Sequence, residues 1–163
     1  MSESEALPSQ TTMAAPAAES STLKSLPFRA PSTSPASGTT SSTWNTPPIE
    51  FLTGRWYVTH STLPMWKSNR NVTITYTPLD SPADAIDDLV EYQPLKSEKQ
   101  KTVRGVDSPD PHVAAAYNWR GRGWLKIASS HWEVLGWGEE EGGWAVTFFA
   151  KTLFTPAAGG ADF

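Results

Sequence analysis

From residue 51 onward, apolar and polar positions alternate with a period of two, which is typical of strands that bury one face. The clearest case is 71–77, where Val72, Ile74 and Tyr76 fall on one face and threonines fall on the other. Almost every residue of this segment favours strands, so it predicts a β-strand. Comparable patterns predict further strands at 51–61, 88–93, 101–106, 115–119, 124–129, 131–136 and 144–153.

The segments between these strands are rich in turn-forming residues. Ser81-Pro82, the SPDP sequence at 108–111, the RGRG sequence at 120–123 and the EEEGG sequence at 139–143 are the clearest examples. Short strands at regular spacing, joined by such turns, predict an all-β antiparallel meander that closes as a sandwich or barrel.

Composition divides the chain into two parts. Residues 1–45 are mainly Ser, Thr, Ala and Pro, and they hold few large apolar side chains. Such a segment cannot bury enough apolar surface to offset the entropy cost of ordering its backbone. We therefore expect a disordered N-terminal tail over 1–45 and one folded domain over 46–163.

Charge and composition argue against several functional classes. The net charge is −4 and the pI is near 5.3, without a basic run of the kind that binds nucleic acid. The chain has no cysteine, which excludes disulfides and thiolate chemistry. His60, His112 and His131 are too widely spaced for a local metal motif, and no phosphate-binding loop or nucleophile elbow is found. We expect neither a metal nor a cofactor.

Targeting signals are equally sparse. No apolar run approaches the ~20 residues of a membrane span, and the N-terminal sequence lacks the apolar stretch of a secretory signal. We therefore expect a cytoplasmic protein without a membrane span. The sequence assigns no oligomeric state.

The segment Phe51-Leu-Thr-Gly54-Arg-Trp56-Tyr57 resembles the first-strand signature of the lipocalins, in the calycin superfamily. In that family the glycine lets the chain turn into the barrel and the tryptophan plugs its closed end, so the resemblance gives Gly54 and Trp56 structural roles. Further segments resemble later strands of the family, in the family's order. They are 71–76, 104–105, 124–127, 131–134 and 144–148. The resemblance implies an up-and-down lipocalin-like barrel around a small ligand.

The chain departs from the family at its end. Lipocalin barrels finish with a strand whose arginine packs on the signature tryptophan, whereas 157–163 contains no arginine and has Gly159-Gly160 near its middle. We expect a barrel that lacks most of its last strand. It would be open between the first strand and 144–153, and Trp56 would lack its arginine partner.

Candidate site residues follow from the alternation of inward and outward positions in a barrel. If Trp56 points inward, so do Val58 and His60, while Met65 and Trp66 lie where lipocalins place a loop over the barrel mouth. On the 101–106 strand, Val103 and Gly105 are the expected inward residues. The residues expected to contact a ligand are Val58, His60, Met65, Trp66, Val72, Ile74, Tyr76, Val103, Leu125 and Ile127.

Two alternatives of inward and outward facing stay open near the C-terminal strands. Either His131, Glu133 and Leu135 point inward, or Trp132 and Val134 do. The same ambiguity sets Trp144, Val146 and Phe148 against Ala145, Thr147 and Phe149.

Two functions fit these features. The first is a carrier or sequestering protein that binds a small hydrophobic or aromatic molecule. The alternative is a cofactor-independent cyclase or isomerase acting on a hydrophobic intermediate, as the small lipocalin-like barrel of allene oxide cyclase does. Proton transfer in such a cavity needs a few polar groups, for which His60, Tyr76, His131 and Glu133 are the candidates. Two inward titratable groups facing each other would favour the enzyme.

Overall fold

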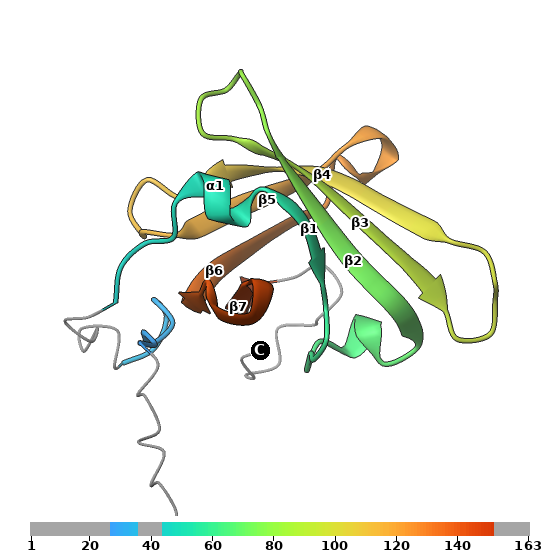
Figure 1. The fold of residues 1–163 in the computed structure, drawn as a ribbon. Helices are drawn as coiled ribbons and strands as arrows, with labels where there is room; N and C mark the ends of the chain where they lie inside the picture. Colours follow the sequence, from blue (N-terminus) through green and yellow to red (C-terminus); the bar gives the residue numbers. More distant parts are fainter. Residues whose placement is uncertain (1–26, 36–43, 152–163) are drawn as a thin grey trace, which may run out of the picture.

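The computed structural model describes residues 27–35 and 44–151. Within these residues, seven antiparallel strands form one sheet in which each strand pairs with the next along the chain. The sheet curls into part of a barrel (Figure 1). Its strands are β1 (Gly54–Tyr57), β2 (Asn69–Pro78), β3 (Ile86–Pro94), β4 (Lys101–Pro109), β5 (Ala116–Gly121), β6 (Ser129–Gly138) and β7 (Trp144–Lys151). The expected all-β, up-and-down, barrel-like fold is confirmed.

Helical structure in the described residues is limited to single turns. They are α1 (Ile49–Leu52) and the 3-10 helices η1 (Pro64–Trp66), η2 (Gly123–Leu125) and η3 (Glu140–Gly142). None of the described helices is long and apolar enough to cross a membrane.

The first strand is shorter than predicted at both ends, and at its start the chain passes through α1. The Thr53 N–H donates to Ile49 O at 3.0 Å and closes this helical turn. Gly54 then has a φ of +113°, a backbone conformation that residues other than glycine rarely adopt. Gly54 thus connects α1 to β1.

The predicted strand at 124–129 is wrong. The β5–β6 ladder ends at the Arg120–Ser129 pair, and the residues between them close this hairpin through η2. As a result Trp124 and Ile127 point into solvent and are 87% and 89% exposed. Leu125 is half-buried and packs over Gly121, where an added Cβ would lie 2.6 Å from the Leu125 Cβ. Local apolar content suggested a strand, but hairpin closure places these residues in a turn.

The register of β6 and β7 settles which residues point inward. Trp132 and Val134 belong to the buried core, and Phe149 packs against it. Trp132 pairs with Phe149, while Glu133 pairs with Phe148 on the opposite face. His131 and Glu133 therefore lie on the outer face.

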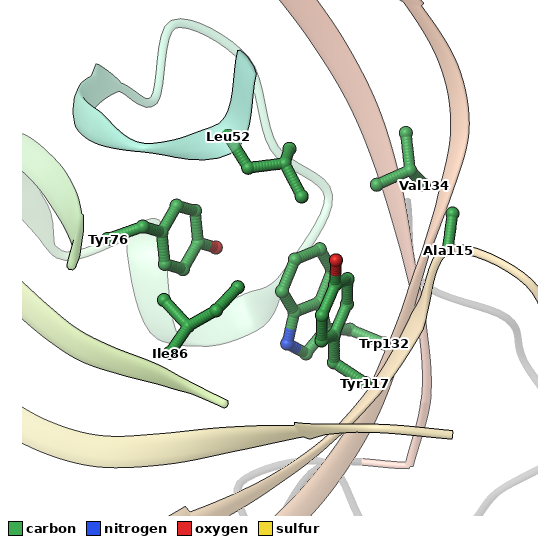
Figure 2. Packing of buried hydrophobic residues seen from close by; sticks show 7 residues of the cluster. All are labelled: Leu52, Tyr76, Ile86, Ala115, Tyr117, Trp132 and Val134. Atoms are coloured by element: carbon green, nitrogen blue, oxygen red, sulfur yellow. The ribbon is translucent and has the colours of Figure 1, made fainter. Parts of the chain in front are cut away.

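The core lies on the inner face of the sheet and is largely aromatic (Figure 2). Trp132 lies between Tyr76 and Tyr117, with ring centroids 5.7 Å and 4.6 Å away. The ring centroid of Phe149 lies 6.4 Å from that of Trp132. The other buried members of this cluster are Leu52, Ile86, Ala115 and Val134.

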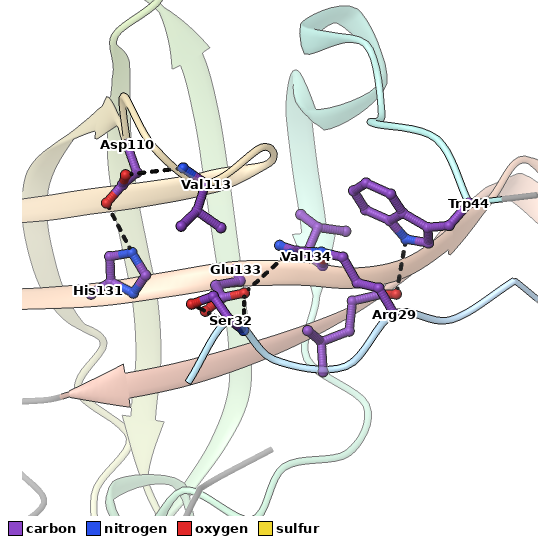
Figure 3. A network of polar contacts seen from close by, with 9 residues as sticks. Arg29, Ser32, Trp44, Asp110, Val113, His131, Glu133 and Val134 are labelled. Carbon is purple, nitrogen blue, oxygen red and sulfur yellow. Dashed lines mark hydrogen bonds and ion pairs between the residues drawn. The ribbon is translucent and has the colours of Figure 1, made fainter. Parts of the chain in front are cut away.

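The segment 27–35 corrects part of the tail expectation, because it packs on the outer face of β6 (Figure 3). Arg29 donates from its backbone N–H to Leu135 O at 2.9 Å and from Nε to Val134 O at 2.8 Å. Phe28 covers Gly136, where an added Cβ would lie 2.4 Å from its ring. Composition does not reveal these contacts, because the partners are distant in sequence. The rest of the predicted tail up to residue 43 lies outside the described residues.

The two edges of the described sheet are β1 and β7. Between residues 44 and 151 no ladder joins these strands, as the open-barrel expectation requires. The stretch from 152 to 163, where a closing strand would follow, lies outside the described residues, so a shortened last strand stays a prediction. Trp56 packs on Phe51 at a centroid distance of 5.3 Å, and its Nε1 donates to Leu52 O at 2.8 Å.

Candidate functional site: an aromatic cavity with buried acids

A cavity of about 710 Å³ lies along the inner face of the sheet. Every one of the seven strands contributes to its lining, and most lining residues are aromatic or aliphatic. A volume of this size and an apolar lining with few polar groups are typical of small-molecule sites. The apolar side chains of the lining include Trp56, Ile74, Val90, Val103, Trp119 and Phe149.

The structure brings most of the predicted ligand-contacting residues to this cavity. They are Val58, His60, Met65, Trp66, Ile74, Tyr76 and Val103. Among them His60 is exposed, and its Nδ1 lies 3.2 Å from Thr59 Oγ1. Trp66 packs edge-on against Tyr92 at 5.7 Å.

Three predicted ligand-contacting residues lie elsewhere. Val72 is buried but does not line the cavity, because the β2–β3 register shifts between Arg70 and Thr73. Leu125 and Ile127 belong to the turn around η2, so their predicted place in the cavity wall is wrong.

Two of the predicted proton-transfer residues lie on the outer face, away from the cavity. His131 Nε2 lies 3.3 Å from Asp110 Oδ2, at a second hollow bordered by Arg120 and Arg122. Glu133 is fully buried and forms an ion pair with Arg29 at 3.1 Å (Figure 3). Their proposed role in the cavity is therefore wrong, whereas His60 and Tyr76 do reach it.

Two buried acids on the inner face are not among the site residues predicted from the sequence. Asp107 on β4 is 0% exposed and Asp88 on β3 is 7% exposed. Asp88 pairs with Gly105 and Ile86 pairs with Asp107, so the two acids are diagonal neighbours on one face. Such neighbours lie roughly 7–8 Å apart, within electrostatic reach. The sequence does contain a signal for Asp88. It lies between Ile86 and Val90 at alternate positions of one strand, so it shares the face of two apolar residues.

Asp107 is held against the aromatic stack. Its Oδ1 accepts a hydrogen bond from Trp132 Nε1 at 2.8 Å. Burial raises the pKa of Asp107 from 3.8 to about 7, and the Trp132 hydrogen bond opposes this rise. A carboxyl that titrates near neutral pH can hold or release a proton at physiological pH.

Asp88 lines the cavity itself. Burial, followed by the nearby charges of Asp107 and Asp87, raises the pKa of Asp88 well above its usual value, while a hydrogen bond from Trp119 opposes the rise. Its Oδ1 has no hydrogen-bond partner among the residues that the structure describes. Burial and the neighbouring acids therefore favour the protonated, neutral form of Asp88 over the carboxylate.

Gly105 creates the space for the Trp119 contact. Trp119 pairs with Asp107 on the neighbouring strand, and its indole lies across Gly105, where an added Cβ would be 2.2 Å from Nε1. This crossing brings the indole N–H to Asp88, which pairs with Gly105. Only a residue without a side chain permits that approach. Gly105 therefore lies on the inner face, next to the indole of Trp119.

The acids on the outer face are engaged differently. Asp87 forms ion pairs with Arg104 at 2.7 Å and Arg122 at 3.0 Å.

Across 27–35 and 44–151, no three His, Asp or Glu side chains gather as a metal-binding group.

A comparison with curated proteins found a protein of similar sequence. The chain is 30% identical over 107 residues to "Botcinic acid biosynthesis cluster B protein 12" of Botryotinia fuckeliana (strain B05.10). The chain is similar to a biosynthesis cluster protein. The match covers 63% of this chain and 49% of that protein, so the chain spans about half the length of the curated relative. No family model matches the chain, and no solved structure matches it.

Proposed function

We propose that this chain is a lipocalin-like barrel protein that binds a small hydrophobic or aromatic molecule on the inner face of its sheet. The observation that carries the proposal is the cavity of about 710 Å³, which has a largely aromatic and aliphatic lining from all seven strands. Removing a ligand's apolar surface from water against such a lining contributes roughly 25 cal/mol per Å² of apolar area buried. Met65 and Trp66 would contact the ligand at the cavity's edge.

A cofactor-independent cyclase or isomerase is the second candidate function. Asp88 and Asp107 favour it, because two buried acids with raised pKa values are the kind of groups that exchange protons with a bound molecule. The similarity to a biosynthesis cluster protein is compatible with this candidate. His60 and Tyr76 would be further polar contacts.

The binding proposal is tested by titrating the full chain with the neutral fluorescent probe N-phenyl-1-naphthylamine. We expect saturable binding tighter than millimolar, which corresponds to about −4 kcal/mol. Val103→Phe should weaken binding because Val103 lines the cavity. Val106→Phe is the matched control, since Val106 lies on the same strand but borders the outer hollow. Absence of saturable binding, or equal loss in both variants, would contradict the proposal.

The second candidate is tested by native mass spectrometry of protein purified from its own cells. Wild-type protein and Asp88→Asn would be compared, and each bound molecule identified by chromatography and fragmentation. An enzyme should carry product in the wild type and accumulate precursor in the variant. The same molecule in both proteins would support binding alone.

A further inference from the structure

Two titratable side chains occupy directly paired positions in the wall of the largely apolar cavity. Tyr76 on β2 pairs directly with Asp88 on β3, and both line the cavity. They are 8% and 7% exposed, respectively. Directly opposed residues of an antiparallel pair have Cβ atoms about 4.5–5.5 Å apart. The Asp88 charge also contributes to the raised pKa of Tyr76, so the hydroxyl and the carboxyl lie close enough to interact.

Asp88 is held in place by one hydrogen bond, but one of its carboxyl oxygens lacks a partner among the described residues. Trp119 donates a hydrogen bond to its carboxyl group, while Oδ1 has no partner among the described residues. A buried polar atom without a hydrogen-bond partner is unfavourable, and such atoms in native structures call for a missing partner. Because Asp88 lines the cavity, a bound molecule is in position to supply that partner.

The protonation of both groups decides what kind of partner fits. Burial raises the pKa of Tyr76 well above 10.0, and the charges of Asp88, Asp107 and Tyr117 raise it further. The pKa of Asp88 is also raised, mainly by burial and then by Asp107 and Asp87. Both shifts favour the protonated forms, which offer O–H donors.

We propose that Tyr76 and Asp88 form a two-donor site for a single acceptor oxygen, a carbonyl oxygen, of the apolar molecule bound in the cavity. This inference rests on the proposed binding function and specifies the ligand's chemistry: a hydrophobic or aromatic ketone or related carbonyl compound. Two O–H donors in a site shielded from water also stabilise negative charge that develops on the oxygen, which a proton-transfer enzyme requires.

The site discriminates against other polar ligands. A carboxylate ligand would lose its hydration while lying near Asp88 and Asp107, and like charges at short range raise its cost of burial. An ammonium ligand would need an ionised Asp88, which the burial of this group opposes. A neutral acceptor oxygen pairs with both O–H groups and leaves neither unsatisfied.

The experiment compares two ligands of the same shape: 2-acetylnaphthalene, and 2-isopropenylnaphthalene, in which CH₂ replaces the carbonyl oxygen. We expect the ketone to bind about tenfold more tightly to the wild-type full chain, because two hydrogen bonds are made in a buried site. Difference infrared spectra of the ¹³C-labelled ketone should show the carbonyl stretch shifted to lower wavenumber on binding.

Variants separate the two donors. Tyr76→Phe and Asp88→Leu should each reduce the ketone preference and the infrared shift, since each removes one donor. Asp88→Asn should keep much of the preference, because its amide also donates. Tyr92→Phe is the matched control, since Tyr92 lies on β3 but outside the cavity lining.

The pH dependence gives an independent measurement that needs no variant. As pH rises, Asp88 loses its proton and its donor, so the ketone preference should fall while hydrocarbon binding stays constant. The groups that face Asp88 are Tyr76, Asp107 and Trp119, with Asp87 adjacent in sequence. In Asp88→Asn this loss of preference should disappear.

The outcomes distinguish the inference from the function on which it rests. If the hydrocarbon binds as tightly as the ketone without an infrared shift, the two-donor site is overturned while cavity binding stands. If neither ligand binds, the proposed function fails. Preferential binding of 2-naphthylmethylammonium would show an ionised Asp88 and would also overturn the inference.

Discussion

Trp132 Nε1 donates a hydrogen bond of 2.8 Å to Asp107 Oδ1, and neither side chain has appreciable contact with solvent. The bond joins the aromatic stack to the buried acids: Tyr76 and Tyr117 lie on either side of Trp132, and Asp88 lies diagonal to Asp107. Aromatic packing therefore fixes the position of one acid and keeps water away from it.

The titration of Asp107 predicts that the free energy of unfolding decreases as pH rises. Its pKa is about 7 in the folded protein and 3.8 in the unfolded chain, so between these values the folded state binds more protons. Stability then falls as pH rises from about 4 to 7, by up to roughly 4 kcal/mol from this group. Asp88 acts in the same direction.

Urea unfolding at pH 5 and pH 8 measures this effect. Asp107→Asn keeps an acceptor for Trp132 but cannot ionise, so its stability should fall less between the two pH values. Asp80→Asn, at an exposed position, should behave like the wild type. Equal pH dependence in the wild type and Asp107→Asn would show that Asp107 titrates normally.

Gly105→Ala should destabilise the fold and displace Trp119. The added Cβ would overlap the indole, with Nε1 at 2.2 Å, and overpacking of this kind costs about 1–3 kcal/mol. Urea unfolding and tryptophan fluorescence should both change. Thr102→Ala, at an exposed position on the same strand, should alter neither. Wild-type stability in Gly105→Ala would mean that the indole does not cross β4 there.

The buried Arg29–Glu133 ion pair predicts a large cost when one partner is removed. Glu133 is 0% exposed and also accepts hydrogen bonds from Ser32 N at 3.1 Å and Ser32 Oγ at 2.5 Å. Arg29→Met leaves this carboxylate buried without its cation, which should cost about 3–5 kcal/mol.

Chemical denaturation of a matched set checks this prediction. The double variant Arg29→Met/Glu133→Gln should recover much of the lost stability, because the buried charge is gone. Arg70→Met breaks an exposed ion pair with Glu98 and should cost less than about 1 kcal/mol. Similar losses in Arg29→Met and Arg70→Met would contradict the structural role of residues 27–35.

The exposed apolar residues around η2 should tolerate polar substitution. Trp124→Ser and Ile127→Ser should change stability by no more than about 0.5 kcal/mol, and probe binding in the cavity should be unaffected. Ile74→Ser, on the cavity wall, should lower the stability and weaken probe binding. If Ile127→Ser impairs binding as strongly as Ile74→Ser does, Ile127 belongs to the wall after all.

Local sequence determined most of the strands and the entry into the sheet. The alternation through Val72, Ile74 and Tyr76 is a property of neighbouring residues, because successive side chains of a strand point to opposite faces. The structural roles expected for Gly54 and Trp56 came from the resemblance of residues 51–57 to the lipocalin first-strand signature, which is itself a short local pattern. The order β1 to β7 follows from short connections, which place sequential strands side by side.

Tertiary structure decided the polar part of the candidate site. Asp88 meets Tyr76 and Asp107 only because the registers of β2–β3 and β3–β4 bring these residues to one face. Their pKa values depend on burial, which raises them, and on hydrogen bonds from Trp119 and Trp132, which lower them and come from more distant strands. The same holds for Ser32, whose partner Glu133 is 101 residues away, and for Ile127, which hairpin closure turns toward solvent. Alternation specifies which face a side chain takes, whereas its partners and solvent exposure depend on how the strands pair.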